Sequence, residues 1–172
     1  NDGDPMDTNG HGTHVAGTIG AEAGNGHPHV GVAWDVQLMA IQVFDASGRG
    51  SMAAVAGAID FATQNGAHVI NLSLGGYGFN QSNYDALSAA GDAGIIVSAG
   101  TGNDAIDNDA MPFFPASYDL ECIIAVAGTD RNDNLASFSN YGKTTAHLAG
   151  PAVTIYSSVA SADDAYDVYD GT

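Results

Sequence analysis

Short apolar runs alternate with stretches of helical spacing along most of this chain, and this alternation limits the folds open to it. The runs at 68–76 and 95–100 each follow a segment whose apolar residues recur with a helical period, and a further apolar run lies at 121–130. Apolar runs of this kind are typical of parallel strands that are covered on both faces by helices. The sequence therefore predicts a three-layer α/β fold with a mostly parallel sheet, and ligand sites at the carboxyl ends of its strands.

The expected element boundaries follow from apolar spacing and from the glycines that interrupt it. Residues 1–10 and 101–114 have the composition of loops. Asn9 or Gly10 is expected to cap the first helix, and Gly66 to end the second. Helices are expected over 11–22, 52–66 and 83–94, and strands over 29–44, 68–76, 95–100, 121–130 and 146–158.

The charge of the chain is strongly one-sided. It carries 20 Asp and Glu residues against three basic ones, which gives a net charge of −17. This balance argues against nucleic acid and anionic membranes as partners. No apolar run approaches the roughly 18 residues of a membrane-spanning helix. The single cysteine, Cys122, lies in an apolar run, so we expect a buried thiol and no internal disulfide.

Two histidines lie one helical turn apart in the stretch NGHGTHVAGTIG, residues 9–20. His11 follows a glycine at an expected helix start, a suitable place for a general base. His14 lies beside Val15 and Ala16 and is expected to be packed or hydrogen-bonded. A shared metal is the alternative, although no H-E-x-x-H spacing and no cysteine pair accompany the two histidines.

Polar and glycine-rich segments follow several of the expected strands. Asn103 comes just after the run 95–100, where its amide can donate to a developing oxyanion or simply make a turn. The segments SLGG, SAGTGN and GRG offer bare backbone to which an extended peptide can pair as an added strand, and turn formation is the simpler alternative.

With these features together, the chain resembles the subtilisin-like serine proteases, or subtilases. NGHGTHVAGTIG is similar to the family's catalytic-histidine motif, and VINLSLGG to its substrate-binding segment. IIVSAGTGN resembles the strand that ends in the oxyanion asparagine. FFPASYDLECIIAVAGTD and NLASFSNYG resemble the segments that follow. The motifs occur in family order and cover nearly the whole chain.

The resemblance implies roles for individual residues. His11 would be the general base and Asn103 the oxyanion donor of a serine endopeptidase. Phe113 would lie near the base of the primary pocket and shorten it. The Phe114–Pro115 bond matches a position that is often cis. The expected substrate-binding residues are Gly48, Arg49, Gly50, Ser73, Leu74, Gly75, Gly76, Ser98, Ala99 and Gly100, with an apolar subsite at Met52, Val55 and Leu74.

Two members of the family's Asp-His-Ser triad are not expected within these 172 residues. Asp7, like Asp2 and Asp4, lies in a loop with no strand before it and is not expected to be the triad aspartate. Ser51 in GSMAAVAG imitates the serine motif but precedes Asn103. The chain is therefore expected to be a partial catalytic domain over 1–172, incomplete at both ends and inactive alone.

The resemblance also implies partners and a location. Protein or peptide substrates, secretion, a monomeric state and no catalytic cofactor are expected for the longer protein, with structural calcium allowed. His147 stands where relatives usually carry a calcium-binding aspartate, and histidine is a poor calcium ligand. The segment 22–31, with Asn25, matches a second calcium loop, whose His27 and His29 are expected to be exposed.

Two other functions are compatible with the sequence. One is a catalytically dead subtilase-like domain that only binds its ligand; retention of both His11 and Asn103 argues against it. The other is a small metal-binding module that uses His11, His14, His27 and His29.

Overall fold

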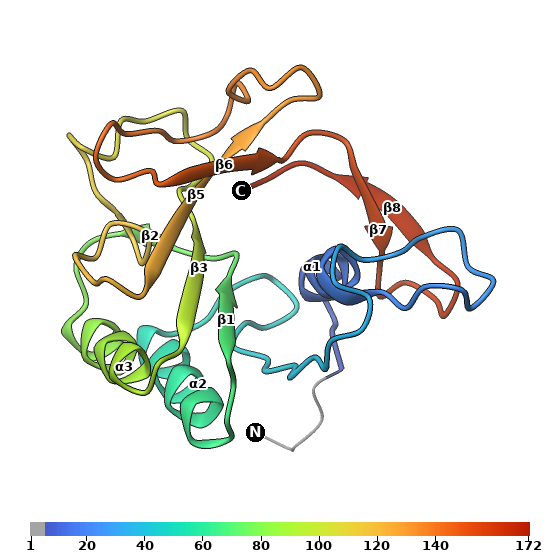
Figure 1. The fold of residues 1–172 in the computed structure, drawn as a ribbon, viewed down its shortest axis with the longest axis horizontal. Coiled ribbons are helices and arrows are strands. Elements are labelled where there is room, and N and C mark those ends of the chain that lie inside the picture. Colours follow the sequence, from blue (N-terminus) through green and yellow to red (C-terminus); the bar gives the residue numbers. More distant parts are fainter. Residues whose placement is uncertain (1–5) are drawn as a thin grey trace. The chain divides into compact units, whose positions relative to one another are not determined.

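The computed structural model describes residues 6–172, which fall into two units, and each is considered by itself (Figure 1). The first unit comprises the chain up to Ser51 together with Thr154–Tyr169, and the second comprises Met52–Val153 with Asp170–Thr172. Asp2 and Asp4 lie outside the described residues.

The second unit is built on a parallel sheet of four strands in the order β1-β3-β5-β6. Val69 lies opposite Ile96 at the start of the sheet, and Val97 lies opposite Ile123. The prediction of a parallel sheet from short apolar runs is therefore confirmed. The four strands are β1 (Val69–Leu72), β3 (Ile96–Gly100), β5 (Ile123–Thr129) and β6 (Leu148–Pro151).

Two helices, α2 (Met52–Gln64) and α3 (Gln81–Asp92), lie side by side next to β1 and β3 (Figure 1). Gly66, with a left-handed φ of 78°, follows α2 as predicted. Helix α3 begins earlier than predicted because the Asn80 side chain accepts the Asn83 N–H at 3.0 Å and caps it. Leu87 of α3 is completely buried, which stabilises this packing by about 2 kcal/mol.

A short antiparallel pair lies at the carboxyl end of the sheet in the second unit. Strand β2 (Gly76–Tyr77) pairs with β4 (Phe113–Phe114), Tyr77 opposite Phe113. Part of the expected loop 101–114 is therefore a strand. The bond that follows Phe114, to Pro115, is cis as the resemblance implied.

The first unit consists of one helix, a hairpin and long connections. Helix α1 (His11–Gly20) packs on β7 (Ile155–Ser158), which pairs antiparallel with β8 (Tyr166–Tyr169). Gly17 lies where a Cβ atom would overlap the Ser157 and Ser158 hydroxyls, so a side chain there would separate helix from hairpin. Ser157 donates its hydroxyl hydrogen to the His14 carbonyl at 2.8 Å, which fixes the contact.

The prediction of one strand over 146–158 is wrong. The segment forms β6 and β7, which belong to different sheets and different units. Thr154, between them, has a φ of 61°. A β-branched residue in the left-handed region interrupts extended backbone, so the chain leaves the parallel sheet at this point.

The prediction of a strand over 29–44 is also wrong. The segment forms a turn and irregular backbone, and within the described residues no ladder pairs with it. An apolar, β-rich sequence becomes a strand only where a neighbouring backbone accepts its hydrogen bonds. Its apolar side chains are accordingly exposed, Val32 at 85% and Trp34 at 58%.

Candidate active site

His11 is the first residue of α1 and belongs to the first unit. Gly10, in a left-handed conformation with φ 99°, precedes it at the N-cap and turns the chain into the helix. His11 is exposed, but neighbouring atoms remove part of the hydration of its ring. This desolvation lowers the pKa of His11 below 6.5; the Asp7 carboxylate opposes the shift and His14 adds to it. A lowered pKa keeps the imidazole neutral, the form in which it can accept a proton.

Asp7 holds the turn that precedes His11. One carboxylate oxygen accepts the Asn9 and Gly10 N–H groups at 2.8 and 2.9 Å. The other accepts both the N–H and the hydroxyl of Thr13 at 2.8 Å. Burial by itself would raise the pKa of Asp7, but these hydrogen bonds lower it to about 2. Gly10 is thus the N-cap, as predicted, and Asp7 supplies the side-chain acceptors for the N–H groups at the start of α1.

His14 is packed and hydrogen-bonded, as predicted. It is 6% exposed, and its Nε2 lies 2.9 Å from the Ile155 carbonyl oxygen. Its ring stacks on Tyr169 with 4.4 Å between centroids. His14 thus ties α1 to both strands of the hairpin, which fixes the helix whose first residue is His11.

The two loop histidines differ from each other. His27 is exposed as expected, 3.6 Å from a carboxylate oxygen of Asp164. The prediction that His29 is exposed is wrong: the ring is half-buried and its Nε2 lies 3.0 Å from the Gly17 carbonyl. In residues 6–172 no group of three or more His, Cys, Asp or Glu side chains has the arrangement to hold a metal ion.

The segment Gly48–Gly50 forms an exposed turn in the first unit and follows no strand. Asp45 closes this turn: its carboxylate accepts the Ser47 and Arg49 N–H groups at 2.8 and 3.0 Å. Gly50 lies against Val43 and Phe44 so closely that a Cβ atom would overlap them. The expectation that GRG follows a strand is therefore wrong, although its backbone is open to solvent.

Asn103 lies in the second unit, three residues after the end of β3. Its amide oxygen accepts the N–H and the hydroxyl of Thr172, each at 3.0 Å. The Thr172 hydroxyl oxygen in turn accepts the Gly102 N–H at 3.1 Å. Because the oxygen is held from one side, the NH₂ of this exposed amide is the group available to a ligand.

A pocket of about 260 Å³ adjoins Asn103. The Phe113 ring narrows it: a Cβ atom on Gly75 would overlap this ring, and one on Gly102 would lie 3.1 Å from it. The lining residues are Ser73, Leu74, Gly75, Gly100, Gly102, Asn103, Asp104, Phe113 and Thr172. Four predicted substrate-binding residues, Ser73, Leu74, Gly75 and Gly100, thus border the same hollow as the predicted oxyanion donor.

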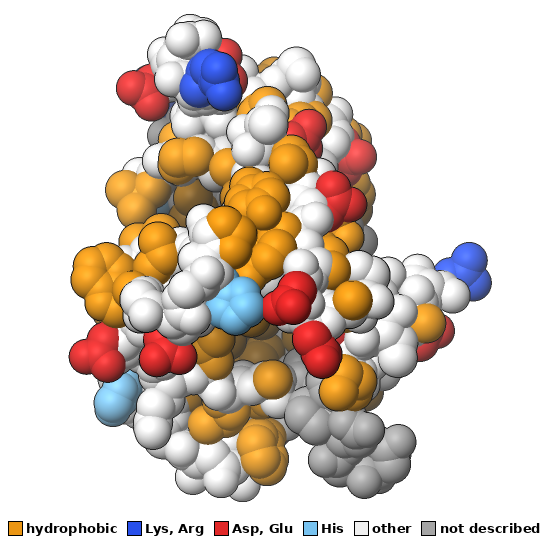
Figure 2. All heavy atoms as spheres, turned by 90° about the vertical axis from the view of Figure 1, so that its right-hand side faces the viewer, with side chains coloured by type: hydrophobic (Ala, Val, Ile, Leu, Met, Phe, Trp, Pro, Cys, Tyr) orange, Lys and Arg blue, Asp and Glu red, His pale blue; other side chains and the backbone are white. Residues whose placement is uncertain are grey.

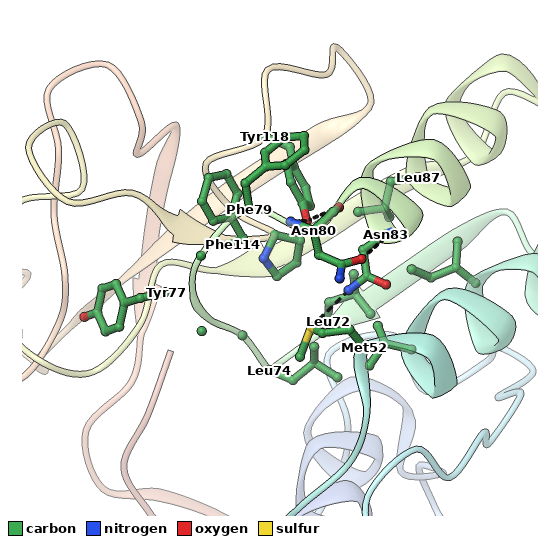
Figure 3. Close-up of a pocket in the computed structure, with 16 residues that line it drawn as sticks. Met52, Leu72, Leu74, Tyr77, Phe79, Asn80, Asn83, Leu87, Phe114 and Tyr118 are labelled. Atoms are coloured by element: carbon green, nitrogen blue, oxygen red, sulfur yellow. Dashed lines mark hydrogen bonds between the residues drawn. The ribbon is translucent and has the colours of Figure 1, made fainter.

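A second pocket, of about 280 Å³, lies between α2, α3 and the β2 segment (Figure 3). Met52, Val55 and Leu74, the predicted apolar subsite, are among its lining residues. Phe79, Phe114 and Tyr118 form its aromatic side, with ring centroids 4.7–5.7 Å apart. The predicted subsite residues therefore share one apolar hollow, which Gly76 also borders.

The remaining predicted substrate-binding residues of the second unit, Ser98 and Ala99, lie in β3 itself. Ser98 is half-buried, and Ala99 is 1% exposed and pairs with Leu72 and Ala125 in the sheet. Burial of Ala99 leaves it no side-chain surface to offer a ligand. It positions Gly100, which borders the pocket.

Sequence reasoning did not find three residues around Asn103. Thr172 holds its amide, while Asn140 and Tyr77 hold the loop that follows it. Asn140 lies in FSNYG and Tyr77 in GGYG, segments that give no local signal of a contact with Asn103.

The His147 position does not fit a calcium site. The ring is exposed, but its Nδ1 accepts the Ala125 N–H at 3.0 Å, so the imidazole completes the hydrogen bonding of β5. A ring nitrogen engaged in this way offers none of the oxygen ligands that calcium prefers.

Acidic side chains are spread over the face shown in Figure 2, between apolar and uncharged ones. This agrees with the net charge of −17. Among residues 6–172, no helix has both the length and the apolar character to cross a membrane.

Comparison with known proteins gives a consistent result. The model of the subtilase family matches residues 1–172. The chain is 42% identical over 166 residues to a thermophilic serine proteinase of Bacillus sp. (strain AK1), covering 96% of this chain and 40% of that protein. It is also 42% identical to subtilisin DY of Bacillus licheniformis (96% and 59% covered) and to thermitase of Thermoactinomyces vulgaris (92% and 54%).

Comparison with a solved structure also points to the subtilases. A crystal structure of a cold-adapted subtilisin-like serine proteinase matches with a TM-score of 0.86 and 34% identity, over 99% of this chain and 58% of that one. This likeness confirms the predicted fold class. The chain spans about half the length of the curated relatives named above. With a family match over its whole length, the chain belongs to the subtilase family.

Proposed function

We propose that this chain forms part of the catalytic domain of a secreted, monomeric serine endopeptidase that hydrolyses peptide bonds in proteins. Residues 1–172 would be a partial domain, to which other parts of the gene product supply a serine nucleophile and an aspartate. Family membership supports the reaction class. The single observation that carries the proposal is the amide of Asn103, held at its oxygen by Thr172 and bordering a pocket.

His11 would act as the general base. Its neutral imidazole takes the proton of the serine hydroxyl as the oxygen attacks the peptide carbonyl, and then passes the proton to the leaving amine. The lowered pKa of His11 favours the neutral ring near pH 7. His14 and Asp7 anchor the helix start, which limits the motion of this base.

Asn103 would stabilise the tetrahedral intermediate. Its NH₂ donates to the oxyanion that forms on the carbonyl oxygen, where a fixed donor costs no reorganisation. Because Thr172 holds the amide oxygen, the side chain is oriented before substrate arrives. This is the preorganisation that electrostatic catalysis requires.

The substrate would pair as an extended strand with the backbone of Ser73–Gly76 in the second unit. The backbone of Gly48–Gly50, in the first unit, is the other segment proposed to bind it. The side chain next to the cleaved bond would enter the pocket beside Asn103, between Gly100 and Phe113. A more distant apolar side chain would enter the pocket of Met52, Val55 and Leu74. The proposed chemistry uses protein side chains alone.

Expression of the complete gene product that contains this chain tests the proposal. We expect it to cleave a chromogenic peptide, His11→Ala to abolish turnover, and Asn103→Leu to lower kcat about 10²–10³-fold with little change in KM. Residues 1–172 alone should show no turnover. Binding of peptide by a complete gene product without cleavage would instead support the dead-domain alternative, and turnover by residues 1–172 that His11→Ala blocks would contradict the assignment.

A further inference from the structure

The Asn140 side chain makes four hydrogen bonds near Asn103, and the proposed function does not use it. It is 0% exposed and lies in the second unit, 37 positions after Asn103. Its amide oxygen accepts the N–H groups of Asp104 at 2.8 Å and Ile106 at 3.1 Å. Both donors belong to the loop that begins at Asn103.

The Asn140 backbone holds the other side of Asn103. Its N–H donates to the Gly102 carbonyl at 2.8 Å, and its carbonyl accepts the Thr101 hydroxyl at 3.0 Å. Asn140 therefore contacts the residues immediately before and immediately after Asn103, one through its main chain and the other through its side chain. A single buried residue thus fixes both ends of the peptide segment that carries the oxyanion donor.

The loop needs such support. Ala105, between the two N–H groups that Asn140 accepts, has a φ of 55°. The left-handed region disfavours a residue with a Cβ atom, so this turn persists only where surrounding bonds impose it. The two bonds to the Asn140 oxygen lie on either side of Ala105 and supply that constraint.

The NH₂ of Asn140 links the loop after Asn103 to the residue that follows the predicted substrate-binding segment Ser73–Gly76. It donates to Asn108 Oδ1 at 3.1 Å and to the Tyr77 hydroxyl oxygen at 3.3 Å. Tyr77, in β2 directly after Gly76, donates its own hydroxyl hydrogen to the Asp104 carboxylate at 2.7 Å. Figure 3 shows this hydroxyl pointing away from the aromatic side of the neighbouring pocket. Tyr77 thus joins the segment Ser73–Gly76 to the loop that follows Asn103.

We propose that Asn140 is a positioning residue for Asn103, and that Tyr77 couples this positioning to the substrate wall formed by Ser73–Gly76. The inference rests on the proposed function, since it assigns Asn140 a part in presenting the oxyanion donor. Asn140 touches no reacting atom. It acts through the backbone of residues 102–106.

The kinetic test uses the complete gene product. Asn140→Ala removes both acceptor and donor, while Asn140→Asp keeps an oxygen for the Asp104 and Ile106 N–H groups. A misplaced donor costs transition-state stabilisation more than ground-state binding, so we expect kcat to fall about 30-fold in the alanine variant and less in the aspartate variant. KM should stay within about twofold in both.

Tyr77→Phe tests the coupling without disturbing the core, because Tyr77 is 45% exposed. We expect kcat about 3–10-fold lower at nearly constant KM. The matched control is Tyr141→Phe, at 43% exposure in the same unit, which should leave kcat unchanged. If Asn140→Ala does not fold, Tyr77→Phe decides: a kcat equal to that of the Tyr141 control overturns the proposal.

Amide hydrogen exchange separates this inference from the proposed function. In Asn140→Ala we expect exchange at Asp104 and Ile106 to be at least about tenfold faster, with amides of β5 unchanged. Faster exchange with an unaltered kcat overturns the positioning role. A wild-type protein without peptidase activity defeats the proposed function instead, whether or not these two amides respond.

Discussion

The N–H and the hydroxyl of Thr172 both donate to the amide oxygen of Asn103, each at 3.0 Å. The hydroxyl oxygen also accepts the Gly102 N–H at 3.1 Å. Three bonds thus tie the end of the described chain to the segment 102–103. An amide held in this way presents its NH₂ in one orientation.

Removal of the Thr172 hydroxyl should therefore lower catalysis at the proposed site. In the complete gene product, Thr172→Val keeps the shape of the side chain and loses two of the three bonds, so we expect kcat to fall about tenfold. Thr172→Ser retains the hydroxyl and serves as control, with kcat close to wild type. Equal kcat values for the valine and serine variants, measured at saturating peptide, would show that the hydrogen bonds of the Thr172 hydroxyl have no part in turnover.

Much of the fold could be predicted from local signals. The runs around Val97 and Ala125 are apolar and short, and both became central parallel strands. The break at Thr154 could not be foreseen, because the preference of that residue is for extended backbone and only its surroundings impose a φ of 61°. The segment 29–44 has strand composition, yet strand formation depends on a partner that composition does not reveal.

In the candidate site, too, residues within local motifs could be predicted from the sequence, whereas residues that act through distant contacts could not. His11 begins α1 and Asn103 follows β3, and both lie inside a recognisable motif, so their prediction needed only the sequence. Asn140 and Tyr77 act through bonds to residues tens of positions away, such as Asp104. Asparagine in FSNYG has the ordinary composition of a turn, and nothing in that stretch indicates what its amide contacts.

The pH dependence of turnover should report the environment of His11. The neutral ring is the active form, so kcat/KM rises as pH increases through the His11 pKa, which burial places below 6.5. The Asp7 carboxylate raises this pKa, and so Asp7→Asn should move the acid limb of the profile to lower pH. Asp164→Asn removes an exposed carboxylate next to His27 and should leave the limb in place. A shift to higher pH in Asp7→Asn would contradict this account.

Asp7 should also make stability depend on pH. Its pKa of about 2 lies below the usual 3.8, so its contribution is complete above pH 3.8 and is lost as pH falls through about 2. After allowance for solvent screening of this partly exposed group, we expect the contribution to be about 1 kcal/mol. Denaturant unfolding of the complete gene product should show Asp7→Ala less stable by that amount at pH 6 and by almost nothing below pH 2.

The control for this measurement is Asp60→Ala, which removes an exposed carboxylate from α2 in the second unit. Its stability difference from wild type should be small and should not follow the same pH window. If Asp7→Ala keeps its full deficit below pH 2, the deficit comes from something other than the carboxylate bonds to Gly10 and Thr13.

Phe113 should set the size of side chain accepted next to the cleaved bond. Its ring meets Tyr77 edge to face, with centroids 5.2 Å apart, and lies against the backbone of Gly75 and Gly102. The ring cannot retreat without displacing these neighbours, so wild-type enzyme should prefer peptides with a small residue, such as alanine, over phenylalanine at this position. Phe113→Ala opens the pocket and should raise the ratio of kcat/KM for phenylalanine over alanine peptides about tenfold or more.

Phe61→Ala provides the matched control for this change, because it deletes an equal ring that is 52% exposed on α2 and does not line the pocket. Its selectivity ratio should equal that of wild type. A ratio unchanged in Phe113→Ala would mean that the side chain next to the cleaved bond does not enter the pocket beside Asn103. Because Asn103→Leu tests the oxyanion donor independently of substrate size, that result would revise the placement of the substrate and leave the role of the amide intact.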